Sequence, residues 1–308
     1  MWSNHWIGYI YILLGVIYIF PAFICLSVLI RPPLVFHSTY KFMCFISVMD
    51  ICNIAACCFF AGFYSLTGAT FKNTPSMLPI GSITLALWVS YCAINIILAF
   101  DRLVCFCSFT WSQRLFSGNS SFLWIALALL AGGQMLIEFD GKQFYHYDSS
   151  IGGWRFELLP EGTKNYRHMA INIGTFACLV LLYSSIVLVV SRKAKQDKLQ
   201  NQAAFQSAAI CGFAMGADIF CIIVQNIQNP SIAMCYGANF AWQLAHGGTG
   251  YACLIMNRTI RDALVNHGKG ILKFFQIKRT ETRVVTVTTS QPHSTGSKIT
   301  NAHTAAQK

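Results

Sequence analysis

Seven long apolar stretches, separated by short polar segments, are the main pattern of this chain. They cover roughly residues 7–30, 42–66, 76–100, 121–138, 168–191, 199–228 and 232–256. Each is long enough for an α-helix to cross a hydrocarbon layer about 30 Å thick. They are apolar nearly all round, whereas a helix of a soluble protein has a polar stripe at a 3.6-residue period. The pattern predicts an all-α membrane protein, a bundle of seven transmembrane helices.

The distribution of Lys and Arg residues predicts the orientation of this bundle. If Met1 lies outside, the inner segments contain 17 of the 22 Lys and Arg residues, and the outer segments contain five. The positive-inside rule therefore predicts an outer N-terminus and an inner C-terminus. The net charge of +11 thus reflects the basic residues that flank the helices on the predicted inner side. Basic residues scattered over loop ends and a tail do not form a surface for nucleic acid, so the lipid bilayer is the expected partner.

The segment from about residue 139 to 167, on the predicted outer side, is rich in aromatic residues. It contains seven of them, and Gly152-Gly153 is placed to turn a hairpin. One interpretation is a lid over the bundle. The other is an amphipathic loop at the lipid headgroup boundary, where Trp and Tyr are enriched.

The C-terminal part changes composition abruptly after His267. Residues 258–275 alternate basic and apolar side chains, which predicts a short amphipathic helix on the inner leaflet after the seventh span. We therefore expect a receptor-like domain over residues 1–267. Residues 268–308 are expected to form a basic, Ser/Thr-rich, disordered cytoplasmic tail.

Polar residues inside the apolar stretches are candidates for function, because burying them in hydrocarbon is costly. Asp50 and His246 lie at similar depths from the inner boundary, so the two side chains can meet. Asn53 and Asn95 are available for the same network. Such a network reorganises between two helix packings, or only fixes helix register.

Asp218 lies nearer the outer side, at about the depth of Trp242 and Gln243. These three residues are placed to hold a small ligand that enters from outside, and the alternative is hydrogen bonding between helices. The aromatic segment and the apolar bundle suggest a small hydrophobic compound. At the inner end of the third stretch, Arg102 of the Asp101-Arg102 pair either exchanges partners with a cytoplasmic protein or anchors the helix.

Several function classes lack support in the sequence. No nucleophile with a base, metal-ligand set or phosphate-binding loop emerges, so neither an enzyme nor a cofactor is expected. A retinal Schiff base needs a Lys in the bundle, and no Lys occurs between Lys198 and Lys269. Most of the 13 cysteines lie inside the stretches, where Cys behaves as a small apolar residue.

The chain resembles the nematode serpentine receptor class T chemoreceptors over about residues 10–265. The residues that carry the resemblance are Asp50, Trp88, Leu98-Ala99-Phe100-Asp101-Arg102, Trp154 with Phe156, His168 with Asn172, Tyr183, Gln206, Cys211, Gln225, Trp242-Gln243-Leu244-Ala245-His246-Gly247 and Asn257-Arg258-Thr259-Ile260-Arg261. The resemblance implies a rhodopsin-like receptor for small chemical cues, coupled to a heterotrimeric G protein in the plasma membrane of sensory neurons and their cilia. An arrestin-like protein is a further candidate partner of the tail.

On this basis two candidate sites are expected. The ligand site comprises Asp218, Trp242, Gln243, Trp154 of the aromatic segment and His168. The G-protein-facing residues are Asp101, Arg102, Arg114, Arg192, Lys193 and Lys195.

The chain departs from the family pattern at several positions. Asp101 stands where Asn is commoner, Thr249 stands where Pro is commoner, and no Pro occurs between Pro160 and Pro230. These departures leave a signalling-incompetent receptor-like protein as an alternative. A seven-helix odorant-gated cation channel is another, although neither charge rings nor pore carbonyls are evident.

Overall fold

The computed structural model describes residues 5–137, 143–158, 165–192, 198–227 and 230–266. The chain divides into two units, Met1–Asp262 and Ala263–Lys308. The first unit holds the bundle. Residues 258–266 are helical, which agrees with the start of the predicted amphipathic helix. The rest of that helix and the predicted tail lie outside the described residues.

Helices occupy all seven predicted apolar stretches. In chain order the elements are α1 (His5–Leu29), η1 (Leu34–Phe36), α2 (Ser38–Ile54), η2 (Ala55–Phe60), α3 (Ala61–Thr67), α4 (Met77–Cys107), α5 (Phe109–Phe116), α6 (Ser120–Ile137), β1 (Gln143–Asp148), β2 (Gly153–Leu158), α7 (Tyr166–Arg192), α8 (Lys198–Asn226) and α9 (Ile232–Met256). The sequence placed Asp101-Arg102 at the end of the third helix, which is wrong. Helix α4 continues to Cys107, because the following residues are apolar and Ser108 is the first residue with extended backbone.

Five of the described helical segments are long and apolar enough to cross a membrane, and α5 with α6 makes a sixth if that pair, bent by 63°, counts as one span. Helix α9 has 25 residues and is not among these segments. It contains Asn239, Gln243, His246 and Thr249, all of them buried. A helix that turns polar groups inward and sits among other spans needs less overall hydrophobicity than one that faces lipid.

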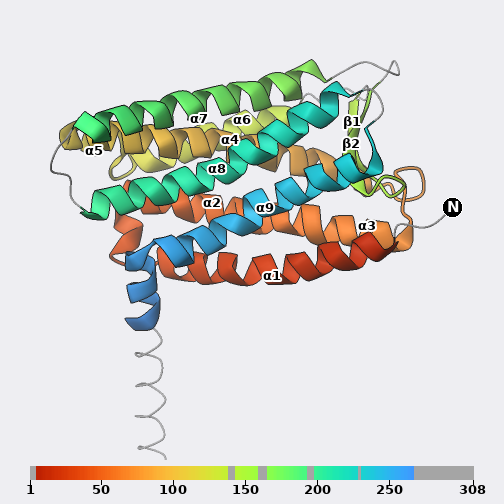
Figure 1. The fold of residues 1–308 in the computed structure, drawn as a ribbon, viewed down its shortest axis with the longest axis horizontal. Helices are drawn as coiled ribbons and strands as arrows, with labels where there is room; N and C mark the ends of the chain where they lie inside the picture. The colour runs from red at the N-terminus through yellow and green to blue at the C-terminus, as the bar shows by residue number, and fades with distance from the viewer. Residues whose placement is uncertain (1–4, 138–142, 159–164, 193–197, 228–229, 267–308) are drawn as a thin grey trace, which may run out of the picture. The chain divides into compact units, whose positions relative to one another are not determined.

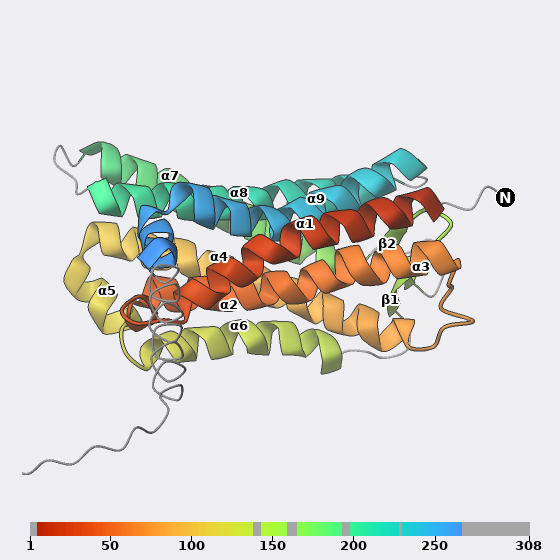
Figure 2. The same ribbon diagram turned by 90° about the horizontal axis from the view of Figure 1, so that it is seen from below.

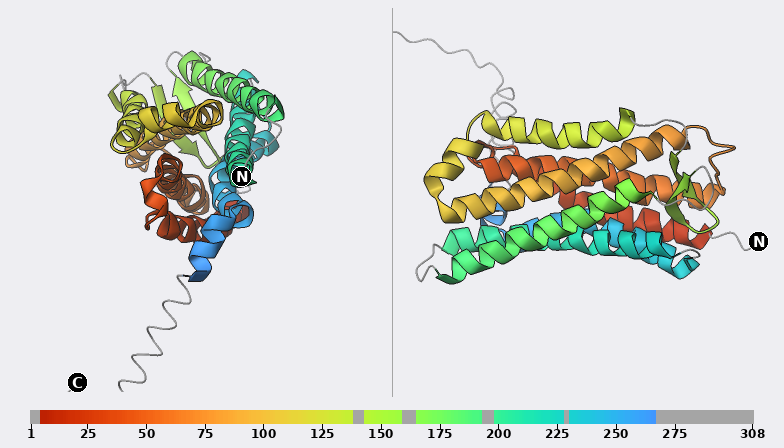
Figure 3. Two further views of the ribbon diagram at one scale, coloured as in Figure 1. Left: turned by 90° about the vertical axis from the view of Figure 1, so that its left-hand side faces the viewer. Right: turned by 90° about the horizontal axis from the view of Figure 1, so that it is seen from above.

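Helix α4 is the centre of the bundle and packs against α2, α6, α7 and α8. Helix α9 packs between α1 and α8, and α1 also packs against α2 and α3. Figures 2 and 3 show these helices running roughly along one common direction. In Figure 1 the β1–β2 hairpin lies at the same end of the bundle as the start of α1, and α5 lies at the opposite end. We call these the hairpin end and the α5 end.

Large apolar side chains cover the outside of the bundle. Leu13 of α1, Leu130 of α6 and Leu181 of α7 are all exposed. In water, an apolar surface of this kind would be unfavourable, whereas lipid tails solvate it. The exposed leucines therefore support a bundle surrounded by hydrocarbon.

Helix α2 continues into α3 through the π-helical segment η2, which covers Ala55–Phe60. A π-helix pairs residues five apart, so it rotates the following residues relative to an α-helix and alters the carbonyl hydrogen bonding. Here the backbone carbonyl of Cys57 accepts hydrogen bonds from two side chains of α9, Asn239 and Gln243. This segment therefore joins the two helices by polar contacts.

Helices α4 and α6 approach closely at Gly132. A Cβ atom at this position would overlap the backbone carbonyl oxygen of Ala86, whereas one at the neighbouring Gly133 would meet open space. We expect Gly132→Ala to lower the melting temperature of the purified protein by several degrees, because membrane helices pack through small residues. Gly133→Ala is the matched control and should leave the melting temperature nearly unchanged. Equal effects of the two substitutions would contradict this packing.

Candidate functional site

Asp50 and His246 form a buried pair between α2 and α9. His246 Nδ1 lies 2.8 Å from Asp50 Oδ1, and both side chains are buried. The sequence places these two residues at depths where they can meet, and in the structure they are in contact. The ring of Tyr91 lies 4.4 Å from that of His246, and the ring of Trp88 lies 5.8 Å from it. The pair is thus enclosed by aromatic residues of α4.

The structure places Asn53 and Asn95 outside this pair. The Asn53 side chain donates to the carbonyl of Met49 on its own helix. Asn95 donates to the Tyr91 carbonyl, and its Oδ1 lies 3.5 Å from the donating sulfur of Cys211. Cys211 in turn accepts a hydrogen bond from Tyr183. Asn95 therefore belongs to a second polar contact, which joins α4, α8 and α7.

The aromatic segment forms the predicted hairpin. Strands β1 and β2 pair antiparallel, with Asp148 opposite Gly153. Gly152 has a φ of 64°, which a glycine adopts readily in a turn. Burial of Asp148 opposes its ionisation, but hydrogen bonds from Ser150 and the charge of Arg155 outweigh this and hold its pKa below the ordinary value. The turn is thus stabilised by an ionised carboxylate.

The hairpin packs onto the bundle as a lid. The Tyr11 hydroxyl donates to the Gly152 carbonyl at 2.8 Å, and the hydroxyls of Ser65 and Tyr147 lie 2.5 Å apart. Burial in this position raises the pKa of the Tyr147 phenol well above its ordinary value. The hairpin therefore contacts both α1 and α3 through buried polar groups. These contacts favour the lid interpretation over a loop resting among lipid headgroups.

Two predicted ligand residues are in contact where the hairpin packs against α9. The ring centroid of Trp154 in β2 lies 6.4 Å from that of Trp242 in α9, and Trp242 lies 6.3 Å from Trp88. Gln243 turns its amide NH2 to the Cys57 carbonyl at 2.8 Å. Asp218 is fully buried on α8, which packs against α9.

His168 is the start of a polar route from the hairpin into the bundle. Its ring lies 5.0 Å from Phe156 of β2, and its Nδ1 lies 2.6 Å from the Gln225 amide. Nδ1 is also 3.4 Å from the amide of Asn172, whose oxygen accepts the Trp88 indole N–H at 3.0 Å. Because Trp88 also packs against His246, the hairpin is connected to the Asp50–His246 pair by continuous contacts.

Buried polar atoms without a hydrogen-bond partner among the described residues concentrate on one helix. Four of them belong to α9 residues at a spacing that puts them on one face, Tyr236, Asn239, Gln243 and His246, and Trp242 adjoins them. Unsatisfied buried polar groups are unusual in a folded protein and need an explanation. Ordered water or a bound polar molecule satisfies groups of this kind. Tyr236 and Asn239 are not among the predicted site residues, although Asn239 lies one helical turn before Gln243.

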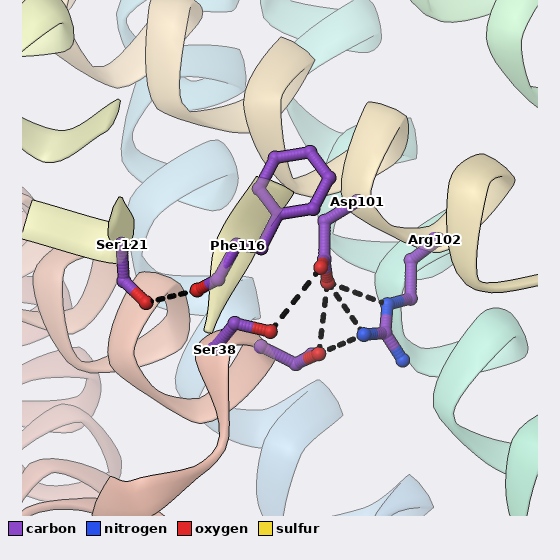
Figure 4. Close-up of polar contacts among 6 residues, drawn as sticks. Ser38, Asp101, Arg102, Phe116 and Ser121 are labelled. Carbon is purple, nitrogen blue, oxygen red and sulfur yellow. Dashed lines mark hydrogen bonds and ion pairs between the residues drawn. The ribbon is translucent and has the colours of Figure 1, made fainter. Parts of the chain in front are cut away.

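At the α5 end, Asp101 holds Arg102 against the start of α2 (Figure 4). The Asp101 carboxylate accepts from Ser38 at 3.2 Å, from Thr39 at 2.9 Å and from Arg102 Nε at 3.1 Å. A terminal nitrogen of Arg102 also contacts the Thr39 hydroxyl. Asp101 is 0% exposed, but the Arg102 side chain is 11% exposed.

Aromatic packing fixes the segment beside this cluster. Phe116 at the end of α5 is buried against Phe42, Phe100 and Trp124. The Ser121 hydroxyl donates to the Phe116 carbonyl, as Figure 4 shows. Through these rings, α5 packs against α2, α4 and α6 next to the Asp101–Arg102 cluster.

The other predicted G-protein-facing residues are exposed where they are described. Arg114 of α5 is exposed and lies 5.6 Å from the ring of Trp111. Arg192 ends α7, whose first turn contacts the hairpin through His168, so Arg192 lies toward the α5 end. Lys193 and Lys195 lie outside the described residues.

Within the described residues, no group of three or more His, Cys, Asp or Glu side chains is arranged to hold a metal ion. All 13 cysteines are free thiols in this structure. The lid is therefore held by aromatic packing and by hydrogen bonds to α1 and α3.

Long apolar helices, an apolar exterior and polar groups turned inward define a multi-span helical membrane protein. The family model described as "Serpentine type 7TM GPCR chemoreceptor Srt" matches residues 1–277. The chain belongs to this family of seven-transmembrane chemoreceptors, as the sequence resemblance predicts. A search of curated proteins finds no match.

Proposed function

We propose that this chain is a G-protein-coupled chemosensory receptor of the plasma membrane, including that of sensory cilia. A small external molecule binds in the half of the bundle beneath the hairpin, and a heterotrimeric G protein binds at the α5 end. The observation that carries the proposal is the face of α9 under an aromatic lid, whose buried polar atoms have no hydrogen-bond partner in the part of the chain that the structure describes. Such groups become hydrogen-bonded when a ligand of matching chemistry binds.

Signalling requires that the ligand favours one of two helix arrangements. A ligand shifts such an equilibrium only through different affinities for the two states. The contacts from Phe156 through His168, Asn172 and Trp88 to His246 supply a physical connection between the ligand site and the middle of the bundle. Arg102, held by a carboxylate of its own helix, is the group that we propose to exchange partners when the G protein binds.

A single cell-based experiment tests this proposal. The chain carries one tag before Met1 and another after Lys308 and is expressed in cells with a G-protein activation reporter. We expect antibody to reach the first tag in intact cells and the second only after permeabilisation. We further expect some members of a chemical panel to activate the reporter.

Three outcomes would overturn the proposal in different ways. Both tags in the same compartment would contradict the predicted topology. An ionic current evoked by an active compound in the absence of G protein would indicate an odorant-gated channel. Surface expression and compound binding without reporter activation, across all G-protein classes, would indicate a signalling-incompetent receptor-like protein.

A further inference from the structure

Among the buried polar atoms that lack a partner within the described residues, those that can only accept a hydrogen bond outnumber those that can only donate one. Five of the ten atoms can only accept, namely Asn53 Oδ1, both oxygens of Asp218, Asn239 Oδ1 and Gln243 Oε1. Only two, the indole nitrogens of Trp154 and Trp242, can only donate. A molecule that bonds to the acceptors of Asp218, Asn239 and Gln243 must therefore bring donors.

The orientation of the two amides on α9 is fixed by their surroundings. Asn239 and Gln243 both donate to the carbonyl of Cys57, at 3.3 Å and 2.8 Å. A carbonyl can only accept, so neither amide can turn its oxygen toward Cys57 without repulsion. Both amide oxygens are consequently left as acceptors for another group.

Asp218 adds a buried carboxylate within α8, and the packed helix α7 carries its arginines only at its two ends, Arg167 and Arg192. The sequence has no Lys or Arg from Leu199 to Asn257, and α4 has none before Arg102. Asp218 is fully buried, and the thiols of Cys92 and Cys221 are close enough to interact with it electrostatically. A buried carboxylate without a positive partner is costly, and a cationic ligand removes that cost.

Tryptophan rings lie on α4 and α9, two of the helices that pack against α8. Trp88 of α4 lies one helical turn before Cys92, whose thiol interacts electrostatically with Asp218, and Trp88 packs against Trp242 of α9. Trp154 covers Trp242 from the hairpin. The faces of tryptophan rings attract organic cations, and aromatic groups of this kind are common in ammonium-binding sites.

We propose that the ligand of this receptor is a small organic amine, bound as an ammonium ion with an apolar body. This inference rests on the proposed ligand site and specifies its chemistry. Asp218 supplies the counter-charge, the amide oxygens of Asn239 and Gln243 accept N–H groups, and Trp242 with Trp154 covers the cation. An ammonium group suits this site because it has three donors and no acceptor.

The test compares compounds that share a carbon skeleton but differ in the polar group. Amine, alcohol and carboxylate versions of butyl, hexyl, octyl and 2-phenylethyl skeletons are titrated against the purified full-length chain. The measurement is the melting temperature, because a ligand that binds only the folded state raises it. We expect amines to act at concentrations about tenfold or more below those of the matched alcohols and carboxylates, as for one charge-assisted hydrogen bond.

Substitution of the carboxylate identifies the group that recognises the amine. Asp218→Asn keeps the size of the side chain and should abolish the preference for amines over alcohols. Asp262→Asn, which alters an exposed carboxylate paired with Arg258, is the matched control and should preserve it. If Asp218→Asn fails to fold, Asp218→Ser provides the same comparison.

The outcomes separate this inference from the proposed function. A preference for alcohols or carboxylates that Gln243→Leu abolishes would overturn the amine proposal and support the ligand site. An amine preference that survives Asp218→Asn would also overturn it. If no member of the panel raises the melting temperature, both the amine proposal and the ligand site are rejected.

Discussion

Arg102→Ala is expected to reduce ligand-dependent G-protein activation by about 10- to 100-fold, the equivalent of losing one or two hydrogen bonds to a charged group. The chain should still reach the cell surface and bind its ligand. Arg102 is partly exposed at the α5 end, and its partners Asp101 and Thr39 can bond to each other without it. Removing the arginine deprives the G protein of a contact and leaves the buried Asp101 carboxylate with the hydroxyls of Ser38 and Thr39, so cell-surface expression is measured beside activation.

Two further substitutions, Arg102→Lys and Arg114→Ala, test whether the effect depends on the guanidinium of Arg102 or on positive charge alone. Arg102→Lys keeps the charge but loses the forked geometry that lets Arg102 bond Asp101 and Thr39 together, so we expect an intermediate loss of activation. Arg114→Ala removes an exposed cation of α5 that lies over Trp111, and is expected to have a small effect. An activation response that Arg102→Ala leaves unchanged would show that this arginine only anchors its helix. Equal losses from Arg102→Ala and Arg114→Ala would indicate general attraction by positive charge.

The contact between Asp50 and His246 was predictable because helix geometry fixes depth. Each residue advances the chain by about 1.5 Å, so counting from a helix end places any side chain along the bundle axis. The same reasoning placed Asp218, Trp242 and Gln243 at one level. Rotation about the helix axis is not fixed in this way. Asn95 has a suitable depth for the Asp50–His246 pair but bonds to Cys211 instead, because packing turns that face of α4 toward α8.

The partners of Asp101 illustrate a second limit. Ser38 and Thr39 begin α2, more than sixty residues before Asp101, and their hydroxyls carry no sequence pattern that marks them as its partners. The π-helix at Ala55–Phe60 likewise consists of small and apolar residues, a composition that is ordinary in a membrane helix. The hairpin turn was predictable from Gly152-Gly153. How the hairpin packs on the bundle depends on contacts between residues far apart in the sequence, such as that of Tyr11 with Gly152.

Asp50→Ala is expected to destabilise the protein by about 3 kcal/mol, because removing one member of a buried pair leaves the other without a partner. His246 is fully buried, and Asp50 is the partner of its Nδ1 atom. Asp50→Asn keeps an oxygen that can accept from His246, so it should retain most of the stability. The measurement is the melting temperature of the purified chain without ligand.

Asn53→Ala is the matched control, since Asn53 is also buried on α2 about one turn from Asp50. Its amide bonds only the carbonyl of Met49 on the same helix, so the loss should be about 1 kcal/mol or less. A double-mutant cycle of Asp50→Ala with His246→Ala then isolates the pair, and we expect a coupling energy of about 1 kcal/mol or more. A coupling near zero would show that burial alone accounts for the effect of Asp50→Ala. In that case the polar route from His168 through Trp88 would end at His246 and would not connect the hairpin to α2.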